Sequence, residues 1–385
     1  MLKRYTRYTK LLLIAFVILA SGYYWKQNQY PHASESATQQ IIEHPIYGTV
    51  TLTSPLEIEI LQSPTMERLK KIHQYGITYY AGLPYFFSRY DHSVGVFLLL
   101  KRFGLTQNEQ IAGMLHDASH TAFSHVAEAV FNHTDHHHSY QDTIHRSFLE
   151  SQGIGTILKK YNLTINDIMH KETDPKFSGN GIFKALEQDL PDLCADRIDY
   201  IIEGGVYEHV VTQDGVNNIL DHLRWNGEKW FFTDVMVAKK FADIALYLTE
   251  NVFSHMLNNV SYQWIATAIN KAFEIGLFSQ EEFCTSVDAL IWEKLESSKD
   301  ATIQEMLYKI INWEEFCEQG TEKNFDKHYK SKFRGVDPLV EVEGKLVRLT
   351  SANTEYAECY NAAKKRMQTG TFVKFIKPQM NSYDK

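Results

Sequence analysis

The sequence predicts a mainly α-helical fold, a helical bundle with small β-hairpins near the start of the folded body and in its C-terminal part. Most segments between residues 65 and 314 place apolar residues at helical spacing. Alternating apolar and polar residues, the pattern of half-buried strands, are found at 46–60 and 338–351. With 385 residues, 44% of them hydrophobic, the chain is long enough to bury a large core.

The N-terminus differs in composition from the rest of the chain. An apolar run, LLLIAFVILA at 11–20, follows four basic residues, namely Lys3, Arg4, Arg7 and Lys10. This order is typical of a signal peptide or a signal anchor, although a bilayer span needs about 20 apolar residues. We therefore expect residues 1–30 to be a signal peptide or an N-terminal membrane anchor. The chain would then be membrane-anchored or exported, with the side of the membrane left open.

The folded body is expected to begin after a polar linker at 31–40. The stretch 46–60 predicts two short strands around Ser54-Pro55. A helix is expected at 106–120, because a Thr106–Glu109 pair forms a capping box at its start. Further helices are expected at 65–76, 91–104, 138–152, 182–203, 235–258, 261–276 and 302–314.

The C-terminal part is expected to mix strands and a helix. The stretch 338–351 predicts a hairpin that turns at Glu343-Gly344, and a helix at 355–370 and a strand at 371–376 should follow. These patterns divide the chain into four parts: an N-terminal segment (1–30), a linker with short strands (31–62), a helical domain (63–290) and a C-terminal α/β appendage (291–385).

Charge and cysteine content exclude two classes of site. A net charge of −8 argues against a broad nucleic-acid surface but allows a local basic pocket for phosphates. The four cysteines form no CxxC pair, so a cysteine-based zinc site is not expected. Free thiols are the expectation, with two disulfides as the alternative in an exported chain, for Cys194, Cys284, Cys317 and Cys359.

Histidines are crowded into the stretch GMLHDASHTAFSH at 113–125. Imidazole and carboxylate groups together suit a divalent transition metal. His116 and Asp117 are adjacent, and at the end of a helix such neighbours can converge on one ion. Further ligands must come from elsewhere, and His92 and Asp196 are the candidates. The alternative is a polar network in the core, which would need every buried group to find a partner.

These four residues form the pattern H…HD…D, which resembles that of the HD superfamily of metal-dependent phosphohydrolases. Wider motifs are similar to those of HD-domain dNTP triphosphohydrolases, which include bacterial dGTPase-like enzymes and the animal sterile-alpha-motif/HD dNTPase. The motifs run from about residue 41 to 203, in the order IIEHPIYGTVTL, SPTMERLKKIHQYG, SRYDHSVGV, GMLHDASHTAFSH, HRSFLE and ADRIDYI. The resemblance implies an HD-domain helical bundle and an enzyme that releases a nucleoside and triphosphate.

The resemblance also implies roles for residues at matching positions. The implied metal ligands are His92, His116, Asp117 and Asp196. The implied catalytic histidines are His120, His125 and His145. The implied substrate contacts are Arg89, Arg197, Gln74, Tyr75, Tyr200 and Tyr262. The implied cofactor is one divalent transition metal, Fe, Mn, Zn or Ni, with Mg²⁺ on the substrate phosphates as a further option.

The chemistry of these residue types agrees with hydrolysis at phosphorus. A divalent ion lowers the pKa of water and polarises a phosphoryl oxygen. Histidines titrate near neutrality and can therefore move protons to or from the reacting oxygens. Arginines bind phosphate oxygens through two parallel hydrogen bonds.

Two departures from the family pattern leave the substrate open. Four residues after Tyr200, where the family usually has an aspartate that contacts the sugar, this chain has Gly204 beside Glu203. The family's arginine that clamps the triphosphate has no counterpart, because Ser254 or His255 stands at that position. A nucleotidase or phosphodiesterase with the same site is therefore the alternative enzyme.

Other departures concern regulation and partners. Arg146 replaces a carboxylate that often follows the catalytic histidine, and Gln40 and Gln62 replace charged residues of the animal activator site. Regulation by dGTP or GTP is thus not expected. The non-enzymatic alternative is a membrane-tethered nucleotide sensor. The expected partners are a nucleotide or phosphoester, the membrane through the N-terminal segment, and a second copy of the chain, since the family commonly forms oligomers.

Overall fold

The structure is a computed structural model that describes residues 39–83, 87–131, 139–169 and 183–376. Contacts divide the chain into two units, Met1–Gln40 and Ile41–Lys385, and the second is the folded body. The boundary expected between residues 290 and 291 stays a prediction. The four cysteines are free thiols, as expected.

The expected membrane attachment is corrected. Its basis, the apolar run within residues 1–30, lies outside the described residues. In the four described ranges, no helix combines the length and the apolar character that a bilayer crossing requires. An apolar run of ten residues is also about half of what a span needs. The prediction of a membrane-anchored or exported chain is therefore wrong on this finding, and the membrane partner has no support.

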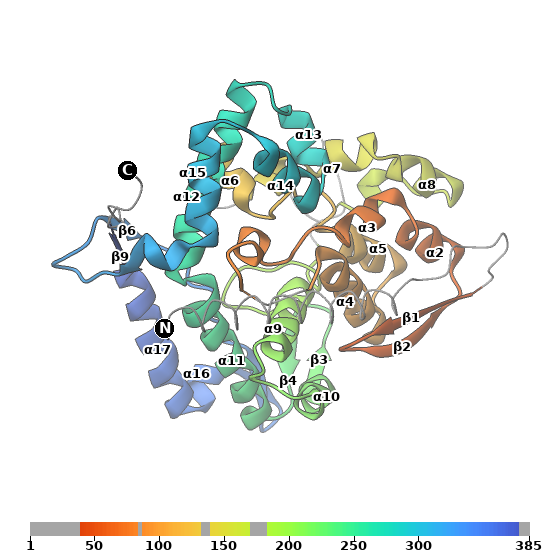
Figure 1. The fold of residues 1–385 in the computed structure, drawn as a ribbon. Helices are drawn as coiled ribbons and strands as arrows, with labels where there is room; N and C mark the ends of the chain where they lie inside the picture. The colour runs from red at the N-terminus through yellow and green to blue at the C-terminus, as the bar shows by residue number, and fades with distance from the viewer. Residues whose placement is uncertain (1–38, 84–86, 132–138, 170–182, 377–385) are drawn as a thin grey trace, which may run out of the picture. The chain divides into compact units, whose positions relative to one another are not determined.

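The body is mainly helical, as predicted, and its larger hydrophobic cluster surrounds four helices. They are α4 (Arg89–Arg102), α5 (Gln107–Leu115), α9 (Ala195–Tyr207) and α11 (Val235–Leu248). Figure 1 shows α4, α5 and α9 side by side. A capping box between Ser88 and Asp91 begins α4, and most of its residues are buried. Gly113 lets α5 pack closely on α4, because a Cβ there would lie 2.5 Å from Leu100.

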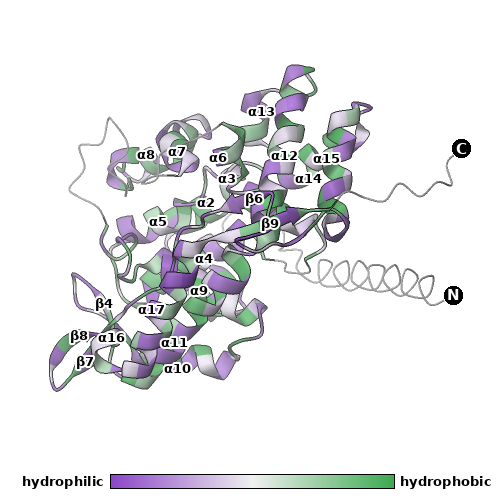
Figure 2. Ribbon diagram, turned by 90° about the vertical axis from the view of Figure 1, so that its left-hand side faces the viewer, coloured by the Kyte–Doolittle hydropathy of each residue, from purple (hydrophilic) through white to green (hydrophobic). Residues whose placement is uncertain are grey.

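A second hydrophobic cluster is built on α12. Its helices are α6 (Val126–Val130), α12 (Met256–Glu274), α13 (Gln280–Thr285), α14 (Asp288–Ser297) and α15 (Ala301–Ile311). Both α6 and α15 pack against α12. Figure 2 shows hydrophilic and hydrophobic residues mixed along α13 and α15, as expected of helices that bury one face and expose the other.

Among the described residues, the strands form three small sheets. The strands are β1 (Gln40–His44), β2 (Gly48–Leu52), β3 (Leu223–Trp225), β4 (Trp230–Phe232), β5 (Cys317–Gln319), β6 (Lys327–Tyr329), β7 (Leu339–Val342), β8 (Lys345–Arg348) and β9 (Thr371–Phe375). Their orders are β1-β2, β3-β4-β7-β8 and β5-β9-β6. β4 and β7 are parallel, with Phe232 opposite Val340. The predicted hairpin is confirmed as β7–β8, and it extends a sheet whose other strands the sequence did not predict.

The remaining helical elements are short or lie at the edge of the body. They are α2 (Pro55–Leu61), α3 (Pro64–Leu69), η1 (Gly76–Tyr79), α7 (Tyr140–Ser151), α8 (Ile154–Lys160), η2 (Ile165–Asp167), α10 (Gln213–His222), η3 (Thr249–Phe253), η4 (Trp313–Glu315), α16 (Leu349–Ala352) and α17 (Thr354–Thr369). η3 is a π-helical turn that continues α11.

Two predicted elements are corrected. Residues 55–61 form α2 rather than a strand, because Ser54 caps the amide of Glu57 and Pro55 occupies the first turn. These end signals outweigh the alternation of the side chains. The helix expected at 182–203 begins only at α9, since Pro191 lacks an amide donor and restricts the residue before it.

Arg68 of α3 fixes the segment that follows α5. Its guanidinium donates hydrogen bonds to the carbonyls of Ala118 at 3.3 Å and His120 at 2.7 Å. It also donates to the carbonyls of Cys284 at 3.1 Å and Thr285 at 2.8 Å. Burial lowers the pKa of Arg68 to about 10, so it stays charged at neutral pH. One buried cation thus ties the histidine segment to the second cluster.

Asp288, the first residue of α14, fixes the same segment from the other side. Its carboxylate is fully buried and accepts from the Phe123 amide at 2.7 Å, the His73 amide at 2.9 Å and His73 Nδ1 at 2.7 Å. Phe123 and Ser124 have φ angles of 60° and 58°, which side chains other than glycine adopt at a cost in energy. The bonds to Asp288 stabilise this turn.

We expect Asp288→Ala to lower the free energy of unfolding by about 3 to 5 kcal/mol, because it leaves buried donors without an acceptor. The measurement is urea denaturation of the full chain. Asp300→Ala is the matched control: Asp300 caps α15 through the amides of Thr302 and Ile303, and its loss should remove about 1 kcal/mol. Equal losses in the two variants would contradict the role of Asp288.

Candidate metal centre

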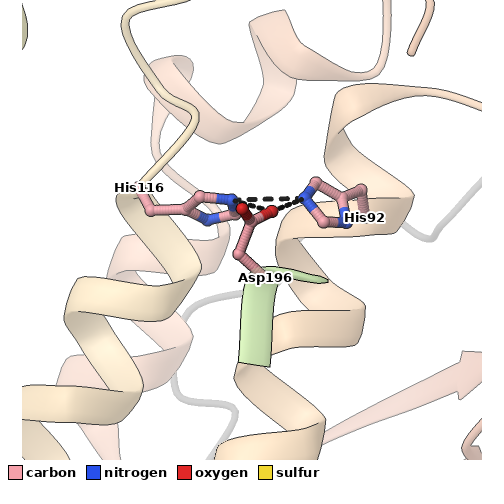
Figure 3. Close-up of side chains that lie close together, drawn as sticks. All are labelled: His92, His116 and Asp196. Atoms are coloured by element: carbon pink, nitrogen blue, oxygen red, sulfur yellow. Dashed lines mark hydrogen bonds and ion pairs between the residues drawn. The ribbon is translucent and has the colours of Figure 1, made fainter. Parts of the chain in front are cut away.

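Three side chains from three helices converge on one point. His92 lies in the first turns of α4, His116 is the C-cap of α5, and Asp196 lies in the first turn of α9. His92 Nε2 is 3.2 Å from His116 Nε2 and 3.0 Å from Asp196 Oδ1, and His116 Nε2 is 3.4 Å from the same oxygen. Figure 3 shows the two rings facing each other with the carboxylate beside them.

The other nitrogen of each ring already has an acceptor. His116 Nδ1 donates to the carbonyl of Gly113 at 2.7 Å, and His92 Nδ1 donates to Asp199 Oδ2 at 2.7 Å. In a neutral imidazole the proton is therefore on Nδ1, and Nε2 carries a lone pair. Two lone pairs that face each other at 3.2 Å repel unless a positive charge lies against them. The donor set therefore fits a divalent metal.

The local charge balance leads to the same conclusion. Three carboxylates, Asp117, Asp196 and Asp199, stand against the single guanidinium of Arg89, which leaves an excess of two negative charges. Burial works against a charged imidazole, but these carboxylates outweigh it and raise the pKa of His92 above its ordinary value. The pKa of Asp196 is held well below its usual range, because the two histidines outweigh the effect of burial. The site thus favours a bound cation.

Asp117 lies at the edge of this group. Its Oδ1 is 3.5 Å from His116 Nε2, and its Oδ2 is 3.7 Å from His92 Nε2. The Nη1 group of Arg89 donates to Oδ2 at 2.5 Å. Burial raises the pKa of Asp117, but Arg89 and the neighbouring histidines lower it well below its usual range. One oxygen of this predicted ligand is thus shared with an arginine.

The predicted catalytic histidines lie in two places. His120 Nε2 is 3.2 Å from Asp117 Oδ1, and the rings of His120 and His125 are 4.9 Å apart. Burial and the charge of Arg89 lower the pKa of His120 to about 3. His145 lies on α7, where its Nδ1 is 2.9 Å from the hydroxyl of Ser119. The first two histidines therefore border the candidate site, and the third reaches its supporting loop.

The two arginines predicted to contact the substrate make hydrogen bonds to different parts of the protein. Arg89 is almost fully buried, and besides Asp117 it donates to Ser124 Oγ at 2.9 Å. Arg197 donates through Nη2 to the carbonyl of Gln188 at 3.1 Å and through Nη1 to that of Asp192. Both guanidiniums are thus fixed by the protein.

The predicted substrate contacts also include aromatic side chains, which pack against one another. The ring of Phe253 contacts Tyr200 and Tyr75 edge-on, at centroid distances of 5.8 Å and 6.5 Å. Gln74 precedes Tyr75, and its Oε1 is buried without a hydrogen bond among the described residues. Burial raises the pKa of Tyr262 to about 12, so it stays protonated at neutral pH. Phe253 closes a π-helical turn, a feature often found near functional sites.

The departure at Gly204 has a steric cause. A Cβ at this position would lie 2.9 Å from Leu248 Cδ1 and 3.1 Å from the hydroxyl of Tyr75. An aspartate therefore cannot stand here without displacing these neighbours. Glu203 points elsewhere: it is fully buried, 3.6 Å from His44 Nε2, and burial and Asp199 raise its pKa well above the usual range. It does not replace the missing aspartate as a charged group.

Sequence reasoning missed the residues that support His92. Asp199 accepts from His92 Nδ1 and from the hydroxyl of Tyr47 at 2.6 Å. Gly95 makes room for it, because a Cβ at Gly95 would lie 2.3 Å from Asp199 Oδ1. One signal was available: Asp199 follows Asp196 by three residues, so the two share a helix face. Tyr47 could not be found this way, since its contact spans 152 positions.

We expect Asp199→Ala to weaken metal binding by roughly 10- to 100-fold, because the carboxylate fixes the tautomer and orientation of His92. Competition with a chelator of known affinity measures this. Asp337→Ala is the matched control, since Asp337 is also a buried aspartate but accepts from Thr350, away from the histidines. Unchanged metal affinity in Asp199→Ala would show that His92 needs no such support.

Comparison with known proteins gives relatives that include two phosphohydrolases. The chain is 29% identical to the uncharacterized protein YdhJ of Bacillus subtilis over 333 residues, which cover 86% of this chain and 98% of the relative. It is 27% identical to the metal-dependent phosphohydrolase cns2 of Cordyceps militaris over 270 residues, 67% of this chain and 73% of that protein. Human deoxynucleoside triphosphate triphosphohydrolase SAMHD1 is 34% identical over 109 residues, 24% of this chain and 17% of the human protein.

No family model matches the chain. A crystal structure of a phosphohydrolase from Bacteroides thetaiotaomicron superposes with a TM-score of 0.65 and 17% identity, over 88% of this chain and all of the other. This likeness shows the fold. The relatives and the converging histidines support a metal-dependent phosphohydrolase, and the chain resembles the HD-domain superfamily of these enzymes.

Proposed function

We propose that this hydrolase acts on a deoxynucleoside triphosphate and releases a nucleoside and triphosphate. The observation that carries the proposal is the convergence of two imidazole lone pairs and a carboxylate in a buried site, beside neutral His120. The human relative, named as a deoxynucleoside triphosphate triphosphohydrolase, supports the choice of substrate.

The metal would be held by His92, His116 and Asp196, with Asp117 as a further ligand from its free oxygen. A divalent ion there supplies Lewis acidity, which polarises a phosphoryl oxygen and lowers the pKa of water. Its identity among Fe, Mn, Zn and Ni is not decided by a set of histidine and aspartate ligands.

Two histidines are placed to act on the reacting oxygens. Burial and Arg89 keep the ring of His120 neutral, so one of its nitrogens can accept a hydrogen bond from the attacking water. His125 is about one-third exposed, its Nδ1 is 3.3 Å from Glu128 Oε1, and it would give a proton to the leaving oxygen. Arg89 would hold Asp117 and lend positive charge to the phosphate side.

A nucleotidase or phosphodiesterase is the second candidate. Gly204 favours it, because an aspartate at this position, where the family binds the sugar, would require Leu248 and Tyr75 to move. The absence of an arginine at Ser254 or His255 favours it as well. Both changes weaken the recognition of a deoxynucleoside triphosphate while leaving the metal ligands in place.

Product analysis separates the two candidates. The full chain, loaded with Mn²⁺ or Fe²⁺, is incubated with dNTPs, dNMPs and cyclic dinucleotides, and the products are resolved by anion exchange. We expect inorganic triphosphate and a nucleoside from a dNTP. Orthophosphate from a dNMP, or opening of a cyclic dinucleotide, without any triphosphate release would select the second candidate.

We expect His116→Ala to lose both bound metal and activity, because it removes a ligand. His120→Gln should keep the metal and lower kcat by about 100-fold or more, because it removes the imidazole that positions the attacking water. Elemental analysis and steady-state kinetics measure the two effects. His222→Gln is the control, since His222 is half-buried on α10 and its ring hydrogen-bonds to the carbonyl of Asn218. Turnover by a metal-free His116→Ala protein would reject the metal-dependent mechanism.

A further inference from the structure

An arginine from the C-terminal half of the body lies beside the candidate site. Arg334 belongs to the irregular segment between β6 and β7, and its guanidinium carbon is 6.0 Å from the centroid of the Phe253 ring. Phe253 contacts Tyr200 edge-on at 5.8 Å. Tyr200 lies one helical turn beyond Asp196 on α9, on the same face. Only two aromatic rings thus separate Arg334 from a proposed metal ligand.

Within the described ranges, the guanidinium of Arg334 forms no ion pair and donates no hydrogen bond. Nearby arginines do have such partners: Arg348 pairs with Asp192 at 2.5 Å, and Arg366 pairs with Glu250 at 2.6 Å. An arginine held against a ring, with its five N–H groups unused, is ready to bind an anion from outside the protein.

The charge of Arg334 reaches the catalytic side of the site. Burial raises the pKa of Glu128, but His125 and, more weakly, Arg334 lower it overall. Arg334 also acts on Tyr262. Burial raises the pKa of this tyrosine, and the charges of Arg89 and Arg334 oppose the rise. Arg334 therefore acts electrostatically on two groups that also interact with Arg89 or His125.

Lys332 adds a second cation. Burial, Arg334 and Arg197 lower its pKa, and Glu187 and Asp189 oppose this effect without cancelling it. Like charges that lie this close repel one another, and an anion bound between them removes the repulsion. The three cations come from two separate stretches of the chain, so no local helix pattern explains their proximity.

The segment that carries Arg334 is anchored. Val336 is fully buried, and the amide of Asp337 donates to the carbonyl of Pro191 at 3.1 Å. Pro191 precedes Asp192, whose carbonyl accepts from the guanidinium of Arg197. The backbone beside Arg334 and the loop that fixes Arg197 are thus joined, which sets the cations in place before any ligand arrives.

We propose that Arg334, with Lys332 as a weaker partner, binds the distal phosphates of the substrate. The inference rests on the proposed triphosphate function, for which it names the phosphate-binding residues. Ser254, where the triphosphate-clamping arginine is missing, directly follows Phe253. Arg334 packs on that same ring, so it supplies a guanidinium at the same place from another part of the chain.

The test measures the binding of inorganic tripolyphosphate and of orthophosphate to the full chain by calorimetry. We expect Arg334→Gln to weaken tripolyphosphate binding about tenfold and orthophosphate binding about twofold or less, because only the longer anion reaches Arg334. Lys332→Gln should weaken tripolyphosphate binding about threefold. Lys345→Gln, which removes a cation on the exposed β7–β8 turn, should leave both affinities unchanged.

Equal tripolyphosphate affinity of the wild type and Arg334→Gln would overturn the inference. Arg334→Lys controls for a folding defect, because it keeps the positive charge but loses the planar guanidinium. A tripolyphosphate affinity between those of the wild type and Arg334→Gln supports a direct contact. Identical losses for both anions would also overturn it. Product analysis tests the proposed function independently of this binding experiment. If Arg334→Gln selectively loses tripolyphosphate binding but the protein hydrolyses only monophosphates, the proposed function is rejected and the anion site is kept.

Discussion

The candidate metal centre depends on one close contact, the approach of His92 Nε2 to His116 Nε2 at 3.2 Å. A carbonyl or a carboxylate holds each Nδ1, which fixes both rings. The helices that carry them pack closely, since a Cβ at Gly113 of α5 would lie 2.5 Å from Leu100 of α4. Packing of the large hydrophobic cluster thus keeps the two imidazoles and a carboxylate together, and a bound cation would relieve the repulsion between neutral rings.

The second cluster has a different task, which is to hold the histidine segment after α5 has ended. The segment contains two residues in the left-handed region, and its own backbone hydrogen bonds are those of short turns, such as His120 N to Asp117 O. Arg68 and Asp288 add further bonds to its backbone from opposite sides. A buried cation and a buried anion are costly to desolvate, so each is used where several backbone groups need a partner at once. The histidines of this segment are therefore placed by Arg68 and Asp288.

The elements that the sequence predicted well have local signals. A capping box marks the start of α5, and Glu343-Gly344 marks the β7–β8 turn. Local signals also explain an error, because the Ser54-Pro55 cap outweighed a strand-like alternation. Contacts between distant residues gave no such signal: Arg68, Asp288 and Arg334 look like ordinary surface charges until the fold brings their partners to them. The motif resemblance identified the histidines and aspartates of the candidate site, but it did not identify the residues that orient them.

The two departures from the family pattern have different physical meanings. At Gly204 the change is steric: Leu248 and Tyr75 fill the space that a side chain would need, so no rearrangement of charge can restore an aspartate there. At Ser254 the change is electrostatic, and a charge acts through space whatever its position in the chain. In the role that we propose for it, Arg334 stands in for the missing arginine, whereas no described residue replaces the missing carboxylate. Recognition of the phosphates is thus easier to retain than recognition of the sugar, and substrate selection in this chain should depend more on the number of phosphates than on the sugar hydroxyl.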